Sequence, residues 1–263
     1  MKEINKIVII GSGNVAWHLS HALQKAGMPL NQVYSRNEAH ARELADSLNV
    51  SYISDIQQIE DASVYLFAVS DSAIESILIS RQWNNAILLH TAGSVNINVF
   101  APFSENYGVL YPLQSFTKDR ELDITAIPFF IEANNAETKK LLNELAIKLS
   151  PKIYEIDSEA RARIHLAAVF ASNYTNYMIT VASQLIEKES IAKEVFNPLL
   201  EETFKKAMQM GSLKAQTGPA RRNNVAVLRK HEQMLSANPD WQKIYTFMAE
   251  NIVKFYKQRN GKF

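Results

Sequence analysis

The chain has 263 residues, of which 47% are hydrophobic and 21% charged, the composition of a globular protein with a substantial core. Its 28 Lys and Arg nearly balance its 27 Asp and Glu, which excludes a bulk positive field for nucleic acid or an anionic membrane. Cys is absent, so disulfide frameworks, thiolate metal sites and cysteine nucleophiles are excluded. We expect no metal site, no signal peptide, no membrane span and a cytoplasmic location.

Short apolar runs alternate with helical patterns up to residue 157. The predicted strands are Lys6–Ile10, Gln32–Tyr34, Val64–Val69, Ala86–His90, Tyr107–Leu110, Phe129–Ile131 and Lys152–Ile156. The predicted helices between them include Val15–Ala26, Ala39–Leu48 and Ala136–Leu149. Several strands are apolar throughout, which is typical of a parallel sheet covered on both faces. The alternation predicts a doubly wound α/β domain over residues 1–157.

From residue 158 onward no further strands are predicted. The expected helices are Ser158–Glu187, Ala192–Met210, Asn224–Ser236 and Asp240–Gln258. They predict an all-α domain over residues 158–263. The first of these helices is apolar nearly all round, so we expect it to be buried on several sides.

A glycine-rich loop follows the first predicted strand and opens the first helix. Its residues are Gly11, Ser12, Gly13, Asn14, Val15 and Ala16, which match the pattern G-x-G-x-x-A. Gly11 allows the tight turn, Gly13 lets the backbone approach a pyrophosphate, and the small Ala16 allows close helix–strand packing. The helix N-terminus offers N–H groups to the phosphates. The pattern predicts a dinucleotide site; the alternatives are a purely structural turn and a methyltransferase-type loop.

The end of the second strand predicts which dinucleotide is bound. Enzymes that use NAD usually carry Asp or Glu there, whereas this chain has Ser35, Arg36 and Asn37. These side chains can donate hydrogen bonds to a 2′-phosphate, which a carboxylate would repel. The sequence therefore favours NADP(H) over NAD. Val69 and Ser70, after the next apolar strand, are expected beside the ribose and nicotinamide.

Other polar residues follow strands whose carboxyl ends should meet at the same edge of the sheet. His90 ends a buried strand and either contacts a substrate, with or without proton transfer, or simply bonds the backbone. Ser94 and Gln114 are candidates for substrate contacts. The helical residues His18, His21, His40 and His231 have charged neighbours and are expected at the surface.

A polar stripe interrupts the apolar helix after residue 158. His165, Ser172, Asn176 and Thr180 are spaced by seven, four and four residues, which predicts one helix face, and Asn173 flanks it. Buried polar groups need partners. Here the partner is a bound substrate, another helix or a dimer mate, and the spacing does not distinguish these alternatives.

Several segments together resemble a known family. They are His90–Ser94, Tyr111–Phe116, His165–Tyr174 and Thr217–Arg222. In this order they are similar to Rossmann-like NADP oxidoreductases that carry a C-terminal domain of unknown function. More distantly, the chain resembles pyrroline-5-carboxylate reductase, deazaflavin-dependent NADP oxidoreductases and the 6-phosphogluconate dehydrogenase-like group.

The resemblance implies an N-terminal NADP-binding domain and a helical domain like that of 6-phosphogluconate dehydrogenase. It also implies a homodimer and a substrate site in the interdomain cleft. Related β-hydroxyacid dehydrogenases carry a catalytic Lys four residues before an Asn. If Asn173 is that Asn, the Lys position is Val169, which cannot transfer a proton. His165, one turn earlier, is the candidate replacement.

The segment from Thr217 to Asn224 adds a candidate substrate contact. Gly218 and Pro219 fix a turn, and Arg221 and Arg222 follow before the next helix. Arg221 either closes on an anionic substrate by a bidentate contact or is solvated at the start of the helix.

The first hypothesis is an NADP(H)-dependent oxidoreductase that acts on a small carbonyl or imine compound. In it His165 exchanges the proton, Asn173 orients the substrate and His90 is a further polar contact. The alternatives are a non-catalytic NADP(H) sensor, suggested by the missing Lys, and a deazaflavin–NADP hydride exchanger, which the glycine loop permits.

Overall fold

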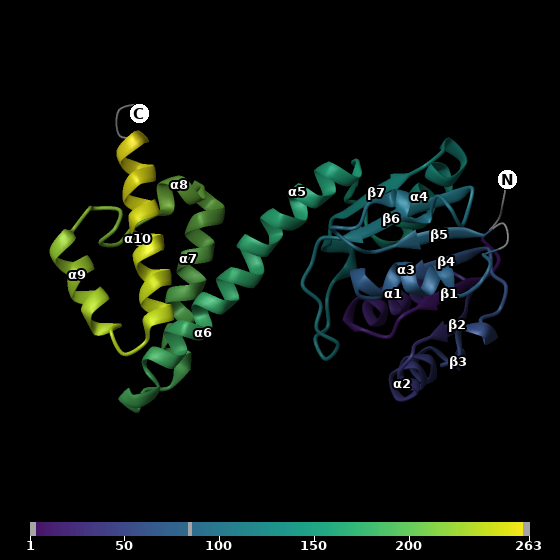
Figure 1. The fold of residues 1–263 in the computed structure, drawn as a ribbon, viewed down its shortest axis with the longest axis horizontal. Helices are drawn as coiled ribbons and strands as arrows, with labels where there is room; N and C mark the ends of the chain where they lie inside the picture. Colours follow the sequence, from purple (N-terminus) through teal and green to yellow (C-terminus); the bar gives the residue numbers. More distant parts are fainter. Residues whose placement is uncertain (1–3, 84–85, 260–263) are drawn as a thin grey trace. The chain divides into compact units, whose positions relative to one another are not determined.

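The computed structural model describes residues 4–83 and 86–259. The chain divides into two compact units, residues 1–174 and residues 175–263. Figure 1 shows that the first unit combines a sheet with helices and that the second is built of helices. The change from strands to helices comes earlier than this division, because the last strand ends at Glu155 and helices begin at Ser158.

An eight-stranded sheet forms the centre of the first unit, in the order β3-β2-β1-β4-β5-β6-β7-β8. All neighbouring strands are parallel except β6 and β7, which are antiparallel. The strands are β1 Ile7–Ile10, β2 Leu30–Tyr34, β3 Ser51–Ile53, β4 Val64–Phe67, β5 Ile87–His90, β6 Asn106–Pro112, β7 Phe129–Ala133 and β8 Ile153–Glu155. The order of the first six is the Rossmann order, with the reversal between β1 and β4. The doubly wound α/β domain that the sequence predicts is therefore confirmed.

Helices cover both faces of this sheet, as the apolar strands require. The helices are α1 Asn14–Lys25, α2 Glu38–Leu48, α3 Asp71–Ile79 and α4 Ala136–Leu149. The apolar faces of α1, α2 and α4 share one core with one side of the sheet. On the other side, α3 and the 3-10 helix η2 (Ile97–Phe100) pack against β1, β4 and β5.

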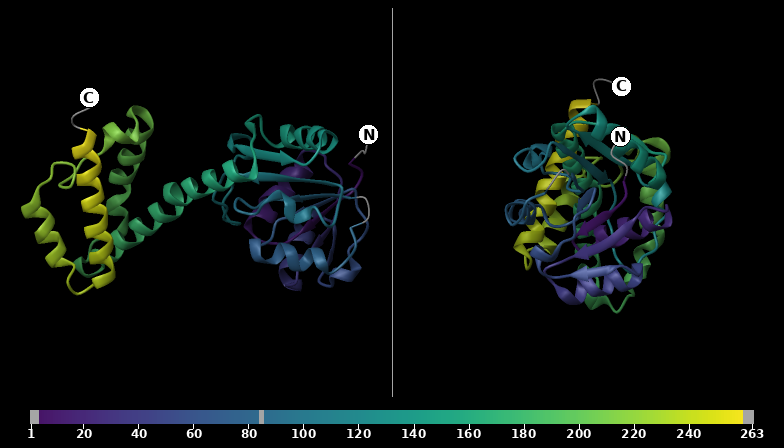
Figure 2. Two further views of the ribbon diagram at one scale, coloured as in Figure 1. Left: turned by 45° about the horizontal axis from the view of Figure 1, so that its top comes forward. Right: turned by 90° about the vertical axis from the view of Figure 1, so that its right-hand side faces the viewer.

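A continuous helical run leads from the first unit into the second (Figures 1 and 2). It comprises α5 (Ser158–Ala168), a π-helix (Val169–Tyr174) and α6 (Thr175–Leu185). The sequence predicts an uninterrupted α-helix over Ser158–Glu187, so the π-helix is a departure from it. A π-helix bonds each N–H to the carbonyl five residues back, so the side chains after it change phase.

The second unit contains α6 and, after it, α7 Asn197–Met210, α8 Ser212–Ala215, α9 Val225–Met234 and α10 Pro239–Arg259. Among its described residues, only three apolar side chains are buried, namely Ala220, Leu235 and Ala249. Many large apolar side chains are exposed instead, and Phe204, Phe247 and Phe255 are examples. No helix in the described parts of the chain has the length and hydropathy that a membrane span requires.

Candidate functional site

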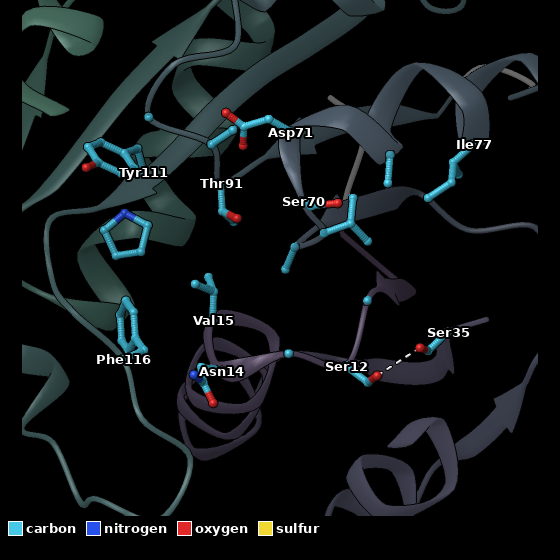
Figure 3. Close-up of a pocket in the computed structure, with 18 of the residues that line it drawn as sticks. Ser12, Asn14, Val15, Ser35, Ser70, Asp71, Ile77, Thr91, Tyr111 and Phe116 are labelled. Atoms are coloured by element: carbon cyan, nitrogen blue, oxygen red, sulfur yellow. Dashed lines mark hydrogen bonds between the residues drawn. The ribbon is translucent and has the colours of Figure 1, made fainter. Parts of the chain in front are cut away.

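A cavity of about 610 Å³ lies at the carboxyl edge of the first unit's sheet. Its walls come from the loops after β1, β2, β4, β5 and β6 and from α5. Figure 3 shows Ser12 and Ser35 at one end of the cavity and Tyr111 and Phe116 at the other. A cavity of this size and position is where open α/β sheets bind their ligands.

The glycine loop has the geometry that its sequence predicts. Gly11 has a φ of +120°, and a Cβ built there would lie 2.3 Å from the Ala68 carbonyl oxygen. The Gly11 amide donates to the carbonyl of Tyr34 at 2.7 Å, which ties the loop to β2. A Cβ built on Gly13 meets nothing within 4 Å. The backbone at Gly13 is therefore open toward the cavity, as a phosphate-binding turn requires.

The start of α1 faces the same cavity. Asn14 and Val15 line it, and no side chain in the described residues caps this helix start. The first N–H groups of α1 are thus left for a ligand, at the positive end of the helix dipole. Ala16 is 1% exposed and packs against the sheet, as the third position of the motif requires.

The end of β2 forms the other side of this part of the cavity. Ser35, Arg36 and Asn37 all line it, with Arg36 exposed. The Ser12 hydroxyl donates to the Ser35 hydroxyl at 2.8 Å, so the glycine loop and the β2 end are joined. Burial raises the pKa of the neighbouring Tyr34, with Arg36 opposing that shift. None of the described residues lining this end is a carboxylate, and the donors present fit an additional phosphate.

These features together fit a dinucleotide. The cavity offers open backbone at Gly13, free amides at α1 and cationic and hydroxyl donors at the β2 end. The predicted contacts Val69 and Ser70 also line it, between the glycine loop and Asp71. The chain's own residues would hold the pyrophosphate at Gly11–Val15 and the adenosine ribose at Ser35–Asn37.

His165 lines the far end of the cavity and contacts Tyr111. The Tyr111 hydroxyl lies 3.1 Å from Nδ1 of His165, and the two rings meet edge to face with their centroids 6.0 Å apart. A Cβ built on Gly93 would lie 2.6 Å from Cγ and from Nδ1 of His165. The imidazole is therefore in contact with both the phenol and the Gly93 backbone. Sequence reasoning did not single out Tyr111, although it lies in the segment that carried the resemblance.

Asp71 is the acidic side chain in the cavity lining. It begins α3, and its carboxylate accepts a hydrogen bond from Ser94, which itself is exposed and does not line the cavity. Burial raises the pKa of Tyr111 above its ordinary value, Arg161 opposes this shift and Asp71 adds to it. Gln114 lines the cavity as predicted, next to Pro112 and Phe116.

His90 is fully buried and does not line the cavity. Its Nδ1 accepts the Ala92 amide at 3.1 Å, and its ring packs against Phe100. Burial lowers its pKa to about 3, with a smaller contribution from the Arg161 charge, so the ring is neutral. Of the two alternatives the sequence left open, His90 bonds the backbone in this structure. It fixes the turn that leads to Gly93.

The loop after β6 crosses the start of α1. Asn14 Oδ1 accepts the Lys118 amide at 3.2 Å, and His18 bonds the Thr117 carbonyl at 2.9 Å. The expectation that His18 is a surface residue is wrong, because the ring is 9% exposed and packs against Phe116. A contact between residues 99 positions apart cannot be predicted from charged neighbours along one helix.

Besides Ala16, His90 and Ser94, two further predicted site residues lie outside the cavity wall. Asn173 is exposed within the π-helix and is not among the residues of the cavity wall. Arg221 belongs to the second unit, where its guanidinium lies 4.4 Å from the centroid of the Tyr256 ring. Ser172 also lies within the π-helix, whereas His165 precedes it, so the seven-residue spacing does not place them on one regular α-helical face.

The fold and this cavity define a dinucleotide-binding protein of the Rossmann class. Residues 6–93 match the family model described as NADP oxidoreductase coenzyme F420-dependent, and residues 127–252 match a domain of unknown function, DUF2520. The chain is similar to the crystal structure of the putative NADP oxidoreductase BF3122 from Bacteroides fragilis. The two are 39% identical with a TM-score of 0.89, over 95% of this chain and 98% of the other.

The chain therefore belongs to this family of NADP oxidoreductases, as the sequence predicts. The expected cofactor, NADP, is the cofactor that appears in the family's description. A comparison with curated proteins found no significant match.

More distant solved structures share the fold. A reductive aminase from Aspergillus terreus, in complex with NADPH and ethyl-5-oxohexanoate, is 16% identical, with a TM-score of 0.71 over 99% of this chain and 95% of the other. A 1-pyrroline-5-carboxylate reductase from Streptococcus pyogenes is 15% identical, with a TM-score of 0.60 over 95% of this chain and 98% of the other.

Proposed function

We propose that this protein binds NADP(H) in the cavity of its first unit and transfers a hydride between the nicotinamide and a small carbonyl or imine compound. The observation that carries the proposal is the cavity itself. It joins a glycine loop with an open backbone to a β2 end of hydrogen-bond donors, and it has an imidazole at the other end. The two distant structures named above act on, or are bound to, compounds of this class.

In this proposal some residues of the chain orient the substrate, and another transfers the proton. When bound, NADPH supplies the hydride to the carbon of a C=O or C=N group. The electron pair of that double bond moves to the heteroatom, which then takes a proton. His165 is the residue we propose to supply it, since it lines the cavity and an imidazole can both donate and accept a proton. Thr91 and Gln114 line the same region and can orient the substrate by hydrogen bonds.

The proposal also gives roles to residues that the sequence predicts for the site but that do not line this cavity. We propose that Asn173 of the first unit and Arg221 of the second unit are further substrate contacts to test, with an anionic group as the partner of Arg221. Ser94 supports the site through Asp71. We also propose a cytoplasmic location for the protein.

We further propose a homodimer. A folded unit needs a core, yet the described residues of the second unit bury only three apolar side chains and expose many large ones. Leu166, Phe170 and Tyr174 on the long helical run are each more than half exposed, although the sequence predicts that this helix is buried on several sides. A second copy would cover these surfaces. Sedimentation equilibrium at two protein concentrations tests this, and a purely monomeric protein contradicts it.

The cofactor proposal is tested by fluorescence titration with NADPH and NADH on three proteins: wild type, Arg36→Ala and Arg42→Ala. Arg42 is the matched control, because it is an exposed arginine on α2 that pairs with Asp46 and does not line the cavity. We expect wild type and Arg42→Ala to prefer NADPH, and Arg36→Ala to bind it about tenfold or more weakly. Absence of binding to either nucleotide contradicts the proposal.

A second candidate function follows from the family model that covers residues 6–93, whose description names coenzyme F420. In it the hydride passes between a reduced deazaflavin and NADP. Mixing reduced coenzyme F420 with NADP and the protein tests this, since oxidation of the deazaflavin changes its absorbance. Turnover with the deazaflavin, and none with a panel of carbonyl and imine compounds, supports this candidate over the first.

A further inference from the structure

Tyr111 has a hydrogen-bonding role at the cavity that the sequence did not indicate. It lies in β6, is 8% exposed and packs against Phe130. Its hydroxyl reaches Nδ1 of His165, a residue of α5 that is 54 positions away. The contact therefore joins the edge of the sheet to the helix that carries the proposed proton donor.

Among the described residues, Tyr111 is the hydrogen-bond partner of Nδ1 of His165. Gly93 lies against Cγ and Nδ1, so closely that a methyl group at position 93 would overlap the ring. Tyr111 contacts the same nitrogen. Among the described residues no hydrogen bond to Nε2 occurs, and His165 is part of the cavity wall. Nδ1 is thus engaged by a protein side chain, whereas Nε2 has no hydrogen-bond partner among the described residues.

A phenol can serve Nδ1 in both protonation states of the ring. When His165 is protonated, the Nδ1–H group donates to the hydroxyl oxygen, and the Nε2–H group can be passed to the substrate. When His165 has given up that proton, the neutral ring keeps its proton on Nδ1 and still donates to the same oxygen, because a hydroxyl can accept as well as donate. Burial raises the pKa of Tyr111, so the hydroxyl keeps its proton at neutral pH.

We propose that Tyr111 is a positioning residue, which engages Nδ1 of His165 so that the proton exchanged with the substrate passes through Nε2. Gly93 shares this role because its backbone lies close against the ring. The inference rests on the proposed function for the identity of His165 as proton donor. It adds that Nε2 is the nitrogen that exchanges the proton and that Tyr111 and Gly93 fix the plane of the ring.

The first experiment needs neither substrate nor cofactor. The full-length protein is labelled with ¹³C and ¹⁵N histidine, and long-range ¹H–¹⁵N correlations report the tautomer of each ring. His165 is assigned from the signals lost in His165→Gln. We expect neutral His165 to carry its proton on Nδ1 in wild type, and Tyr111→Phe to give a mixture of both tautomers. A wild-type neutral ring protonated on Nε2, or unchanged His165 signals in Tyr111→Phe, overturns the inference.

Tyr154→Phe is the matched control. The ring of Tyr154 stacks on the same Phe130 at a centroid distance of 5.4 Å, but Tyr154 does not line the cavity. This substitution should leave the His165 signals unchanged. Because Tyr111→Phe removes only one oxygen and keeps the packed ring, we expect it to fold, and its melting temperature checks this directly.

The second experiment uses a substrate from the carbonyl and imine panel. We expect Tyr111→Phe to lower kcat about tenfold with KM changed less than threefold, because His165 remains but loses its restraint. In a His165→Gln background the same change should have no further effect, since Tyr111 acts through His165. An equal loss in both backgrounds contradicts the inference. If no substrate is found, the proposed function fails, and the tautomer result still decides the role of Tyr111.

Discussion

The hydroxyl of Ser12 lies 2.8 Å from the hydroxyl of Ser35, so one hydrogen bond joins the glycine loop to the end of β2. The two residues come from the first and second strand-to-helix loops and are 23 positions apart. Both line the part of the cavity that we assign to the adenosine ribose and its phosphate. Neither hydroxyl carries a charge, so the pair does not repel a 2′-phosphate.

The first prediction is that Ser35→Asp reverses the cofactor preference. A carboxylate at this position repels a 2′-phosphate and can accept hydrogen bonds from ribose hydroxyls. We expect NADPH affinity to fall tenfold or more and NADH affinity to rise, as measured by fluorescence titration. Ser35→Ala is the control, because it removes the hydroxyl without adding a charge and should give no gain for NADH. A Ser35→Asp protein that still prefers NADPH contradicts our placement of the ribose.

The second prediction separates the two glycines of the loop. Gly11→Ala places a methyl group against the Ala68 carbonyl at a φ of +120°, so the backbone must shift. We expect it to lower the free energy of unfolding by about 2 kcal/mol. Gly13→Ala has open space around its new methyl group, so the free protein should keep its stability.

The binding of NADPH should respond differently, because the Gly13 methyl group occupies the space that we assign to the pyrophosphate. We expect Gly13→Ala to keep the melting temperature of the free protein and to lose the increase that NADPH gives wild type. Thermal unfolding with and without NADPH measures both quantities. A Gly13→Ala protein that NADPH still stabilises fully would show that the phosphates lie elsewhere.

The local parts of this site could be predicted from the sequence. The glycine loop, Ser35–Asn37 and Gln114 depend on short patterns at strand ends, and all of them line the cavity except Ala16, whose predicted role is packing. The predicted elements omit β3 and α3. β3 is a three-residue edge strand with an exposed Ser51, and so it lacks the apolar run that marks a buried strand.

The long-range parts could not be predicted in this way. The Tyr111 contact with His165 depends on how α5 crosses the sheet edge, and no periodicity within either segment encodes that. The π-helix after Ala168 could not be predicted either, because its residues fit an α-helical pattern equally well. The burial of Arg161, at 1% exposure, depends on the acidic partner that β7 provides.

The third prediction concerns acid stability and His90. Its folded pKa is about 3, below the ordinary value of 6.5, because burial disfavours the charged ring. Between these values the unfolded chain takes up a proton that the folded chain refuses, so stability falls as the pH falls. The contribution is complete above pH 6.5 and is lost progressively toward pH 3, at about 1.4 kcal/mol per pH unit.

The comparison protein for this prediction is His90→Asn, whose amide oxygen can still accept the Ala92 N–H group but does not titrate. Urea unfolding at intervals from pH 7 to pH 5 gives the free energy of unfolding for both proteins. We expect the wild-type curve to be steeper by about 1.4 kcal/mol per pH unit near pH 5.5. Parallel curves would mean that the folded protein accepts a proton on His90.

The fourth prediction concerns the buried ion pair of Arg161 and Glu132. The Arg161 guanidinium donates to the Glu132 carboxylate, to the Val95 carbonyl and, at 3.1 Å, to the Ser158 hydroxyl. The Ser158 hydroxyl also donates to Glu132 at 2.8 Å. This network anchors α5, and with it His165, to β7. Removing the carboxylate charge leaves a buried cation, so we expect Glu132→Gln to cost about 3 kcal/mol or more.

Glu155→Gln provides the matched control, because Glu155 lies on the neighbouring strand β8 and pairs with Lys139 at the surface, where both side chains are about half exposed. That substitution should change the free energy of unfolding by less than about 1 kcal/mol. The double variant Arg161→Met, Glu132→Leu should recover much of the loss, since apolar side chains can replace a buried ion pair. Urea unfolding at pH 7 compares all four proteins. If Glu132→Gln costs no more than Glu155→Gln, the buried pair does not anchor α5.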